Sequence, residues 1–326
     1  MSRQLIGIDV GGTKLSVGSL HDGKLDGPQV IPTAVASAQA LMDEIAGAVE
    51  AVRSGETAAI GIGVPSVVEF ATGRVKSTVN LELADVLLRT VLQERLELPV
   101  FVDNDATCAA LAEAYDGTDM AVQNLVMITV GTGVGGGLVL GGRVYRGATG
   151  AAGEIGHTLI GAALEHGAPP AGSFPQAGSL ESLASGRALD ELGARLARED
   201  PGSALGREAE EHPVQGAEVV AAAQQGDENA RAVIRLLGER LGIGIANAIN
   251  VFDPELVVIG GGVATAGELL LEPARQIARR FVLPGVGERT EIRLARHGPN
   301  AGVLGAALLA RHELEAQASQ AARVGT

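Results

Sequence analysis

The sequence contains one cysteine and no tryptophan, and both absences limit what the chain can be. A single cysteine, Cys108, excludes an intramolecular disulfide and any metal cage that needs several cysteine ligands. Its neighbours are alanines and a threonine, so we expect it to be a small buried side chain rather than a nucleophile. Aromatic residues make up only 2% of the chain, so the core must be built from Ala, Val, Leu and Ile.

Positive charge is also scarce. The 25 Lys and Arg residues against 39 Asp and Glu residues give a net charge of −14, which argues against binding to a nucleic acid backbone. No basic and then apolar leader begins the chain, so no secretory signal is expected. The most apolar long stretch, residues 241–263, is interrupted by Asn and acidic residues and is not expected to span a membrane. These features predict a cytoplasmic protein, and 326 residues predict two domains.

Glycine, in contrast, is abundant, and it is densest at residues 131–137, where five of seven residues are glycine. Such a turn lets the backbone approach a ligand closely, and its successive N–H groups form a concavity suited to a phosphate. The spacing also satisfies the dinucleotide fingerprint G-x-G-x-x-G, but that fingerprint requires a helix directly afterwards. The residues that follow are typical of a strand, a turn and another strand. The dinucleotide interpretation therefore fails.

The same arrangement occurs near the start of the chain. Residues 5–10 and 15–20 are apolar strands, and a Gly-Gly-Thr-Lys turn at 11–14 joins them. Two such hairpins facing one another can hold a polyphosphate between them, although either alone could be an ordinary tight hairpin.

The pattern after each glycine turn is similar. In the first half, helices are predicted at 36–53, 81–97 and 106–114, with strands at 58–64 and 99–102. In the second half, strands are predicted within 125–147, at 256–259 and at 291–294, with helices at 180–198, 216–225, 228–251, 267–281 and 302–314. The polar residues 199–213 are expected to form a connector. Three strands followed by helix, strand, helix, strand and helix is the order of a ribonuclease-H-like domain.

Six motifs, in this order, resemble the ROK (repressor, open reading frame, kinase) family of sugar kinases in the actin-like ATPase superfamily. They lie at residues 7–14, 102–106, 131–137, 153–157, 181–186 and 253–262. The resemblance implies an α/β fold of two ribonuclease-H-like (actin-like ATPase) domains with an interdomain cleft. The smaller domain would comprise residues 1–109 and 302–326, and the larger one residues 110–301.

Phosphoryl transfer requires positioned phosphates, cancellation of their charge and a group that takes the acceptor's proton. The resemblance implies that Asp105 is this catalytic base, although an Asp before a helix can equally be its N-cap. Asp9, at a strand end, is expected to hold the Mg²⁺ that accompanies ATP. The residues expected to bind ATP are Asp9, Gly11, Gly12, Thr13, Lys14, Thr132, Gly133, Gly261 and Gly262.

A sugar requires several fixed donors and acceptors. The resemblance implies that Asn80, Asn104, Asp105, Glu154, His157 and Glu181 supply them. A turn-forming role for Asn104 and a structural role for His157 are the alternatives. Asn80 lacks the Gly-Trp that usually follows it in the family, since Leu81 is followed by Glu82 here.

The main departure from the family concerns zinc. Family members usually carry a cysteine-rich run between the histidine and the later glutamate, whereas residues 162–180 contain no cysteine. Structural zinc favours four Cys and His ligands, and this segment offers only Glu165 and His166. We therefore expect no zinc site, and what orients His157 is left open.

The predicted function is ATP-dependent phosphorylation of a hexose, with glucose first. Alternatives are a kinase for an N-acetylated amino sugar, mannose or fructose, polyphosphate as the donor, and a non-catalytic ROK sugar sensor. A sensor is expected to have lost Asp9 or Asp105, and both are present. A ROK repressor would need a helix-turn-helix before the first glycine turn. The expected partners are a sugar and ATP, without nucleic acid or membrane, in a homodimer.

Overall fold

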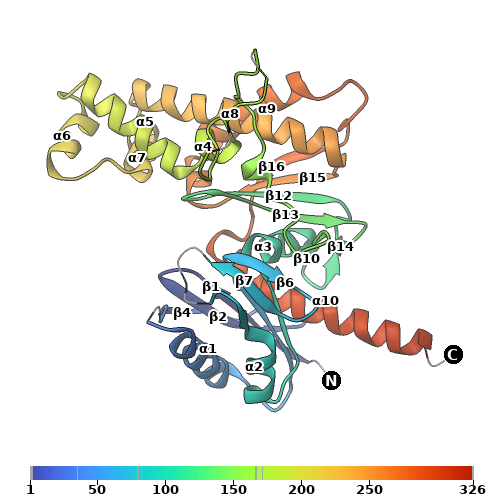
Figure 1. Cartoon of the computed structure of the whole chain (residues 1–326). Coiled ribbons are helices and arrows are strands. Elements are labelled where there is room, and N and C mark those ends of the chain that lie inside the picture. Colours follow the sequence, from blue (N-terminus) through green and yellow to red (C-terminus); the bar gives the residue numbers. More distant parts are fainter. Residues whose placement is uncertain are drawn as a thin grey trace. The chain divides into compact units, whose positions relative to one another are not determined.

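The computed structural model describes residues 3–34, 36–78, 81, 83–165, 167–170 and 172–324. The chain forms two compact units, shown in Figure 1. Unit 1 comprises Met1–Gln123, Gly137–Ala152 and Arg296–Thr326, and unit 2 comprises Asn124–Gly136 and Gly153–Ala295. The domain boundaries expected from the sequence, at 109/110 and 301/302, stay a prediction.

Unit 1 is built on a six-stranded mixed sheet. Its strands are β1 (Gln4–Val10), β2 (Lys14–His21), β3 (Lys24–Leu25), β4 (Gln29–Pro32), β5 (Thr57–Val64) and β9 (Val100–Asn104). They lie in the order β3-β2-β1-β5-β9, and β4 pairs with β2. β1, β5 and β9 are parallel, whereas β1 and β2 form the antiparallel hairpin around the first glycine turn. The carboxyl ends of three strands therefore meet at one edge of this sheet.

One face of this sheet is covered by α1 (Ala38–Val52) and α2 (Leu88–Leu96) (Figure 1). The Ser37 side chain caps α1 by accepting from the Ala40 backbone N–H. Leu41, Ile45 and Val49 recur at helical spacing on α1 and are buried in a core that also holds Ile8 of β1. Burial of this apolar stripe is what fixes the helix on the sheet.

The opposite face is covered by α10 (Ala301–Val324), which lies unusually close to the sheet. Gly18, Gly7 and Gly61 are register partners on β2, β1 and β5, so they form a row across the sheet. A Cβ at Gly7 or Gly61 would collide with the α10 backbone. Side chains alternate between the two faces of a strand, so the row leaves a shallow channel for the helix without disturbing the core beneath α1.

Unit 1 contains further short elements. They are β6 (Ser66–Glu69), β7 (Arg74–Thr78), β8 (Val86–Leu87), α3 (Asp105–Ala114), β10 (Tyr115–Asp116), β11 (Asp119–Met120), β14 (Arg143–Val144) and η3 (Gly298–Asn300). The predicted helix at 81–97 is too long at its start. Asp85 has a φ of +66°, and Val86 pairs with Val75 of β7, so the chain is extended there and α2 begins only at Leu88.

A second mixed sheet has the order β14-β13-β12-β15-β16. Its remaining strands are β12 (Leu125–Val130), β13 (Val134–Leu140), β15 (Leu256–Gly260) and β16 (Glu291–Leu294). β12, β15 and β16 are parallel, and β15 is buried along its whole length. The order repeats that of the first sheet: a hairpin partner, a first strand and then two parallel strands. The predicted α/β fold with two such sheets is confirmed.

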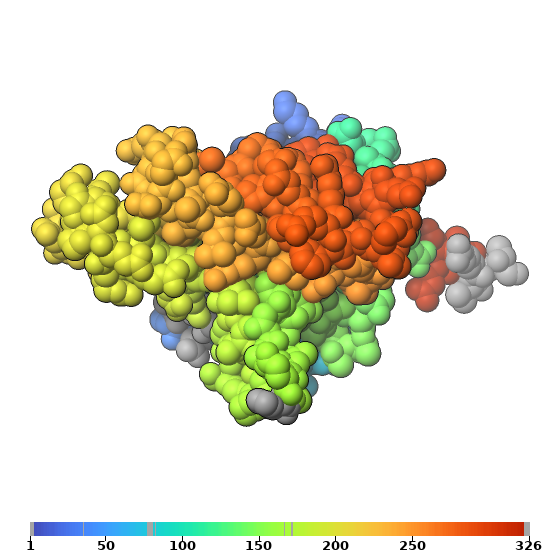
Figure 2. All heavy atoms as spheres, turned by 90° about the horizontal axis from the view of Figure 1, so that it is seen from above, coloured from blue at the N-terminus to red at the C-terminus, as the bar shows by residue number. Residues whose placement is uncertain are grey.

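The helices of unit 2 are η1 (Ile155–His157), α4 (Leu180–Ala184), α5 (Gly186–Glu199), α6 (Ala204–Glu211), α7 (Gly216–Gln224), α8 (Glu228–Phe252), η2 (Gly262–Ala266) and α9 (Glu268–Phe281). The predicted connector at 199–213 is wrong in part, because Ser203 caps α6 within it. Gly238 and Gly242, one turn apart on α8, allow α9 to pack closely. Figure 2 shows α8 and α9 in orange beside the yellow α5–α7 segment.

No helix in the described part of the chain is long and apolar enough to cross a membrane. The last helix, predicted at 302–314, continues to Val324. Most of its added turns are exposed, so no apolar periodicity marks them in the sequence.

Candidate active site

Asp9 lies near the end of β1, at the edge of the first sheet where β1, β5 and β9 end together. It pairs with Gly63 of β5, which in turn pairs with Asp103 of β9. This register brings Asp9 near Asp105, the first residue after β9. Burial, and then the Asp105 carboxylate, raise the pKa of Asp9 to about 6. Two predicted site residues are thus electrostatically coupled within unit 1.

The first glycine turn follows Asp9 directly. The Gly11 N–H donates to the Lys14 carbonyl at 2.8 Å, and the Thr33 hydroxyl donates to the Gly11 carbonyl at 2.7 Å. Thr13 and Lys14 are exposed, whereas Gly11 and Gly12 are partly buried. The turn is therefore held from behind, with its tip open to solvent. Its expected contact with ATP phosphates stays a prediction.

Gly302, at the start of α10, was not identified from the sequence. A Cβ at this position would collide with the Asp9 carboxylate. The carboxylate therefore lies against the first turn of α10, where the unpaired N–H groups of a helix favour negative charge. The signal in the sequence was the pair Gly302 and Gly305, spaced to let a helix approach other atoms closely.

Asn104 and Asp105 divide two roles at the start of α3. The Asn104 side-chain oxygen accepts from the Ala106 and Thr107 N–H groups at 2.9 and 3.2 Å, so Asn104 is the N-cap. Asp105 is the first helical residue, and its Oδ1 accepts from the Ala106 N–H at 2.8 Å. The capping role that was the alternative for Asp105 belongs to its neighbour. Asn104 thus has a structural role, as a helix cap rather than the turn former given as its alternative, and its sugar contact stays a prediction.

Cys108 lies one turn further along α3 and is buried. Burial, with three nearby aspartates, raises the pKa of its thiol well above the usual value. Because the thiolate is the nucleophilic form, Cys108 is a packing residue rather than a reactive one.

In unit 2, the second glycine turn contacts one of the expected sugar ligands. The Val134 N–H donates to Glu181 Oε2 at 2.8 Å, and a Cβ at Gly133 would collide with the same oxygen. The Gly186 N–H also donates to the Gly131 carbonyl at 2.7 Å. Hydrogen bonds therefore join the turn to α4 and to the first residue of α5, with Thr132 exposed at the tip of the turn.

The motif at 153–157 packs against the same turn. Cβ atoms at Gly136 and Gly156 would collide with the carbonyls of Gly153 and Val134 respectively. These close approaches join η1 to the start of β13. Glu154 and His157 consequently belong to the same cluster as Gly133 and Glu181.

His157 lies beside a carboxylate and an aromatic ring. Its Nε2 lies 3.8 Å from Glu154 Oε2, and its ring meets Phe174 edge-on at 5.4 Å between centroids. Its Nδ1 is buried and has no hydrogen-bond partner among the described residues. The loop that carries Phe174 is closed by backbone bonds, among them Ile160 N–H to the Gly178 carbonyl at 2.8 Å. Figures 1 and 2 show this light-green loop projecting from unit 2.

Gly261 and Gly262 follow β15, at the same sheet edge as the second glycine turn. Gly261 has a φ of +87°, and a Cβ there would collide with the Val130 carbonyl just before that turn. Only glycine suits this position. Gly262 opens η2, and a Cβ there would meet no atom within 4 Å. Ligands of open α/β sheets bind at such carboxyl ends of parallel strands.

Residues able to hold a metal lie in two places. Asp9 offers carboxylate oxygens as metal ligands. Burial and the Asp105 carboxylate both raise its pKa, so a nearby cation would offset the cost of its negative charge. Among the described residues, Glu208, His212 and Glu218 also bring three ligand atoms within 4.8 Å of one another, on the exposed α6–α7 corner. The predicted absence of zinc stays a prediction.

Asn80, one of the expected sugar contacts, lies outside the described residues.

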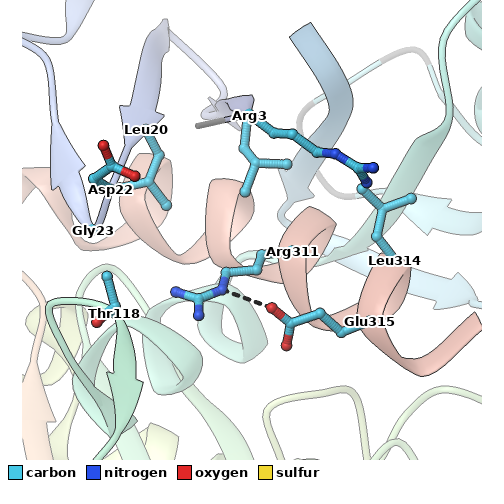
Figure 3. Close-up of a pocket in the computed structure, with 9 residues that line it drawn as sticks. Arg3, Leu20, Asp22, Gly23, Thr118, Arg311, Leu314 and Glu315 are labelled. Carbon is cyan, nitrogen blue, oxygen red and sulfur yellow. Dashed lines mark hydrogen bonds and ion pairs between the residues drawn. The ribbon is translucent and has the colours of Figure 1, made fainter. Parts of the chain in front are cut away.

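A hollow of about 250 Å³ in unit 1 is lined by residues of β1, β2 and α10. Figure 3 shows Arg311 paired with Glu315 in it, with Arg3 and Asp22 around the rim. None of the predicted site residues lines this hollow. The candidate site residues therefore lie at two strand edges, one in each unit, and not in this pocket.

Two repeated α/β sheets, each ending in a glycine turn, define the chain as an actin-like ATPase in fold. The ROK family model matches residues 5–313. A glucokinase from Halalkalibacterium halodurans is 37% identical over 320 residues, which make up 95% of this chain and 96% of that protein. The chain belongs to the ROK family.

Two further relatives help to interpret the site. The structure of a ROK glucokinase from Streptomyces griseus in complex with glucose and AMPPNP has a TM-score of 0.77 and 32% identity, covering 95% of this chain and 99% of that one. An N-acetyl-D-glucosamine kinase from Escherichia coli O6:H1 is 32% identical over 314 residues, covering 93% of this chain and 98% of that one. The Streptomyces griseus glucokinase thus binds a sugar together with an ATP analogue.

Proposed function

We propose that this protein transfers the γ-phosphoryl group of ATP to a hydroxyl group of a hexose, with glucose as the first substrate to test. The observation that carries the proposal is the pair Asp9 and Asp105. Asn104 caps α3 in place of Asp105, and the Asp105 carboxylate raises the pKa of Asp9. Glucokinases that share full-length similarity with the chain support the choice of sugar.

In this mechanism Asp105 accepts the proton of the attacking hydroxyl group as the oxygen bonds to phosphorus and the bond to ADP breaks. Asp9 would hold Mg²⁺, directly or through water, and the ion would neutralise phosphate charge. The turns at Gly11–Gly12 and Thr132–Gly133 would donate backbone N–H groups to the phosphates. Gly261 and Gly262 would leave space for the adenosine.

The sugar hydroxyl groups would contact Glu154, His157 and Glu181. Asn104 would contact the sugar with the hydrogen-bonding capacity of its side chain that capping α3 leaves over. The Nδ1 of His157 supports this assignment, because it is buried without a partner among the residues that the structure describes and would gain free energy from a hydroxyl partner. Asn80 is retained as a proposed contact on the family resemblance alone.

A kinase for N-acetylglucosamine is the second candidate, favoured by the similarity to the Escherichia coli enzyme. The two candidates differ at the 2-position of the sugar, where the acetamido group needs additional space. Comparing kcat/KM for glucose, mannose, fructose and N-acetylglucosamine in one assay separates them.

The deciding experiment runs over that sugar panel on wild type and Asp105→Asn. ADP release is measured with ATP as donor, and sugar phosphate formation is measured with polyphosphate as donor. We expect the variant to lose about 10²–10⁴-fold in kcat, the usual contribution of a general base, with sugar binding retained. Asp227→Asn is the matched control, because Asp227 caps α8 and Asn caps equally well. A loss of only a few-fold in Asp105→Asn would contradict the assignment of the base.

A further inference from the structure

Asp103, which directly precedes the Asn104–Asp105 pair, is buried at the end of β9, with only 3% of its side chain exposed. Its Oδ1 accepts from the Asn104 N–H at 2.9 Å, and its Oδ2 lies 2.7 Å from Nε of Arg146. Burial raises the pKa of Asp103, and the Arg146 guanidinium opposes that rise. A buried carboxylate is costly unless it is paired, so these two contacts fix the end of the strand.

Arg146 is itself held on several sides. It comes from the segment after β14, and only 19% of its side chain is exposed. Its Nη2 donates to Glu313 Oε1 of α10 at 2.8 Å, and its guanidinium carbon lies 3.5 Å from the centre of the Phe70 ring. A planar guanidinium that is paired at two nitrogens and stacked on a ring has little freedom to turn.

We propose that Arg146 is a positioning residue for Asp105. Arg146 fixes the Asp103 carboxylate, Asp103 fixes the Asn104 backbone, and Asn104 starts α3 with Asp105 as its first residue. The inference rests on the proposed function, because it assigns Asp105 the role of base. It adds a residue about 40 positions away in the sequence that touches neither sugar nor nucleotide in the mechanism.

The first test compares Arg146→Met and Arg146→Lys in the ADP-release assay, with folding checked by circular dichroism. We expect Arg146→Met to lower kcat about 10²-fold, the effect of misplacing a catalytic group by about 1 Å. The sugar KM should change less than about threefold, because no sugar contact is removed. Arg146→Lys should recover part of kcat, since an ammonium group keeps the charge but cannot make the same two bonds.

The matched control is Arg95→Met, which breaks an exposed ion pair with Asp43 on α1. We expect it to leave kcat unchanged, because exposed pairs contribute little. Should Arg146→Met fail to fold, Glu313→Gln replaces it. This variant keeps the pair between Arg146 and Asp103 and removes only the charge that holds the other end of the guanidinium. We expect kcat of Glu313→Gln to fall about tenfold.

The sharper test repeats each change in the Asp105→Asn background. If Arg146 acts through Asp105, adding Arg146→Met or Glu313→Gln should cause no further loss beyond about twofold. A second full loss would show that the network acts on something else and would overturn the inference. The inference would also be overturned if Arg146→Met folds and keeps wild-type kcat while Asp105→Asn is inactive. The same holds for Glu313→Gln where it replaces Arg146→Met. Wild-type activity in Asp105→Asn would overturn the assignment of Asp105 as the base and this inference together, whereas a wild type that phosphorylates no sugar would overturn the proposed function.

Discussion

Asp9 in unit 1 and Thr129 in unit 2 occupy equivalent positions in the two sheets. Each lies two residues before the first glycine of a turn, and each pairs in parallel with a glycine, Gly63 or Gly260. The strand orders of the two sheets also correspond, apart from β4, which is an additional strand on β2 in the first sheet. The framework is therefore repeated, while the side chain at the penultimate position of the first strand differs, Asp9 in β1 and Thr129 in β12.

The chemistry of the two edges differs accordingly. The first edge gathers carboxylates, with Asp9 and Asp105 coupled and Asp103 buried behind them. The second edge offers a glycine turn in which one backbone N–H, that of Val134, already donates to Glu181, and it has Glu154 and His157 beside it. In the proposed function, unit 1 would supply metal binding and proton transfer, while unit 2 would supply mainly hydrogen bonds. The following predictions test that division.

Among the substitutions that compare the two edges, the largest effect is expected from replacing Asp9, with its equivalent Thr129 replaced in a separate variant. Asp9→Asn should lower kcat/KM for Mg·ATP about 10²-fold, because it removes the charge that holds the cation near the phosphates. Thr129→Val should cost less than about tenfold, because no charge is lost. Initial rates at varied Mg·ATP measure both. Equal losses in the two variants would show that the two edges are not specialised.

Next in size is Gly302→Ala. The added Cβ collides with the Asp9 carboxylate, and a displacement of about 1 Å should lower kcat between about 10- and 10²-fold. The matched control is Gly47→Ala in the interior of α1, where a Cβ meets no atom within 4 Å. This control should keep its activity and gain up to about 1 kcal/mol in stability. Normal kcat in Gly302→Ala would mean that Asp9 moves without consequence.

A smaller effect is expected at the second edge. Glu181→Gln and Gly133→Ala both disturb the contact between Glu181 and the Val134 N–H, and should raise the sugar KM about tenfold, roughly 1.4 kcal/mol. The kcat should fall less than KM rises. Glu199→Gln, an exposed exchange at the end of α5, is the control. A fall in kcat alone would place Glu181 in the chemical step instead.

The pH dependence should single out Asp9. Its pKa of about 6 means that it is ionised at pH 7 and becomes protonated as the pH falls through 6. The Mg²⁺ concentration for half-maximal rate should therefore rise about tenfold per pH unit below 6 in wild type, and should not do so in Asp9→Asn.

Lowering the pH should weaken Mg²⁺ binding but should remove a cost of Asp9 to the free energy of unfolding. Because the folded pKa of Asp9 is raised, its ionisation opposes folding, and this cost disappears as the pH falls from above 6 towards 4. Asp9→Asn should thus be more stable than wild type at pH 7.5, with the difference shrinking at pH 5. Urea unfolding of both proteins at the two pH values measures this. A constant difference would contradict the raised pKa.

The smallest effect is expected from removing metal. The loop between η1 and α4 is closed by backbone hydrogen bonds and by the contact of Phe174 with His157. Chelation should therefore lower Tm by less than about 1 °C, where a structural zinc would contribute far more. Elemental analysis of the purified protein is the direct check. About one tightly held zinc per chain, needed for activity, would contradict the prediction.

The sequence by itself determined the class of fold and most of the candidate residues. Two apolar strands around each glycine turn, with later helices and strands in the same order, are local patterns, because hydrophobic periodicity and glycine spacing act over short distances. The carboxylates at strand ends could be located for the same reason. The start of α2 could not, because pairing with β7 overrides the helical pattern there.

Only the tertiary structure decided how those residues are supported. Asn104 rather than Asp105 caps α3, Gly302 accommodates Asp9, and Arg146 reaches Asp103 and Glu313 across 43 and 167 positions of sequence. The Asn104 cap is a local contact, but the approach of Gly302 to Asp9 and the two pairs of Arg146 join segments that are distant in the sequence. Such contacts leave no periodic signal, because their partners are brought together by the fold and not by their spacing along the chain.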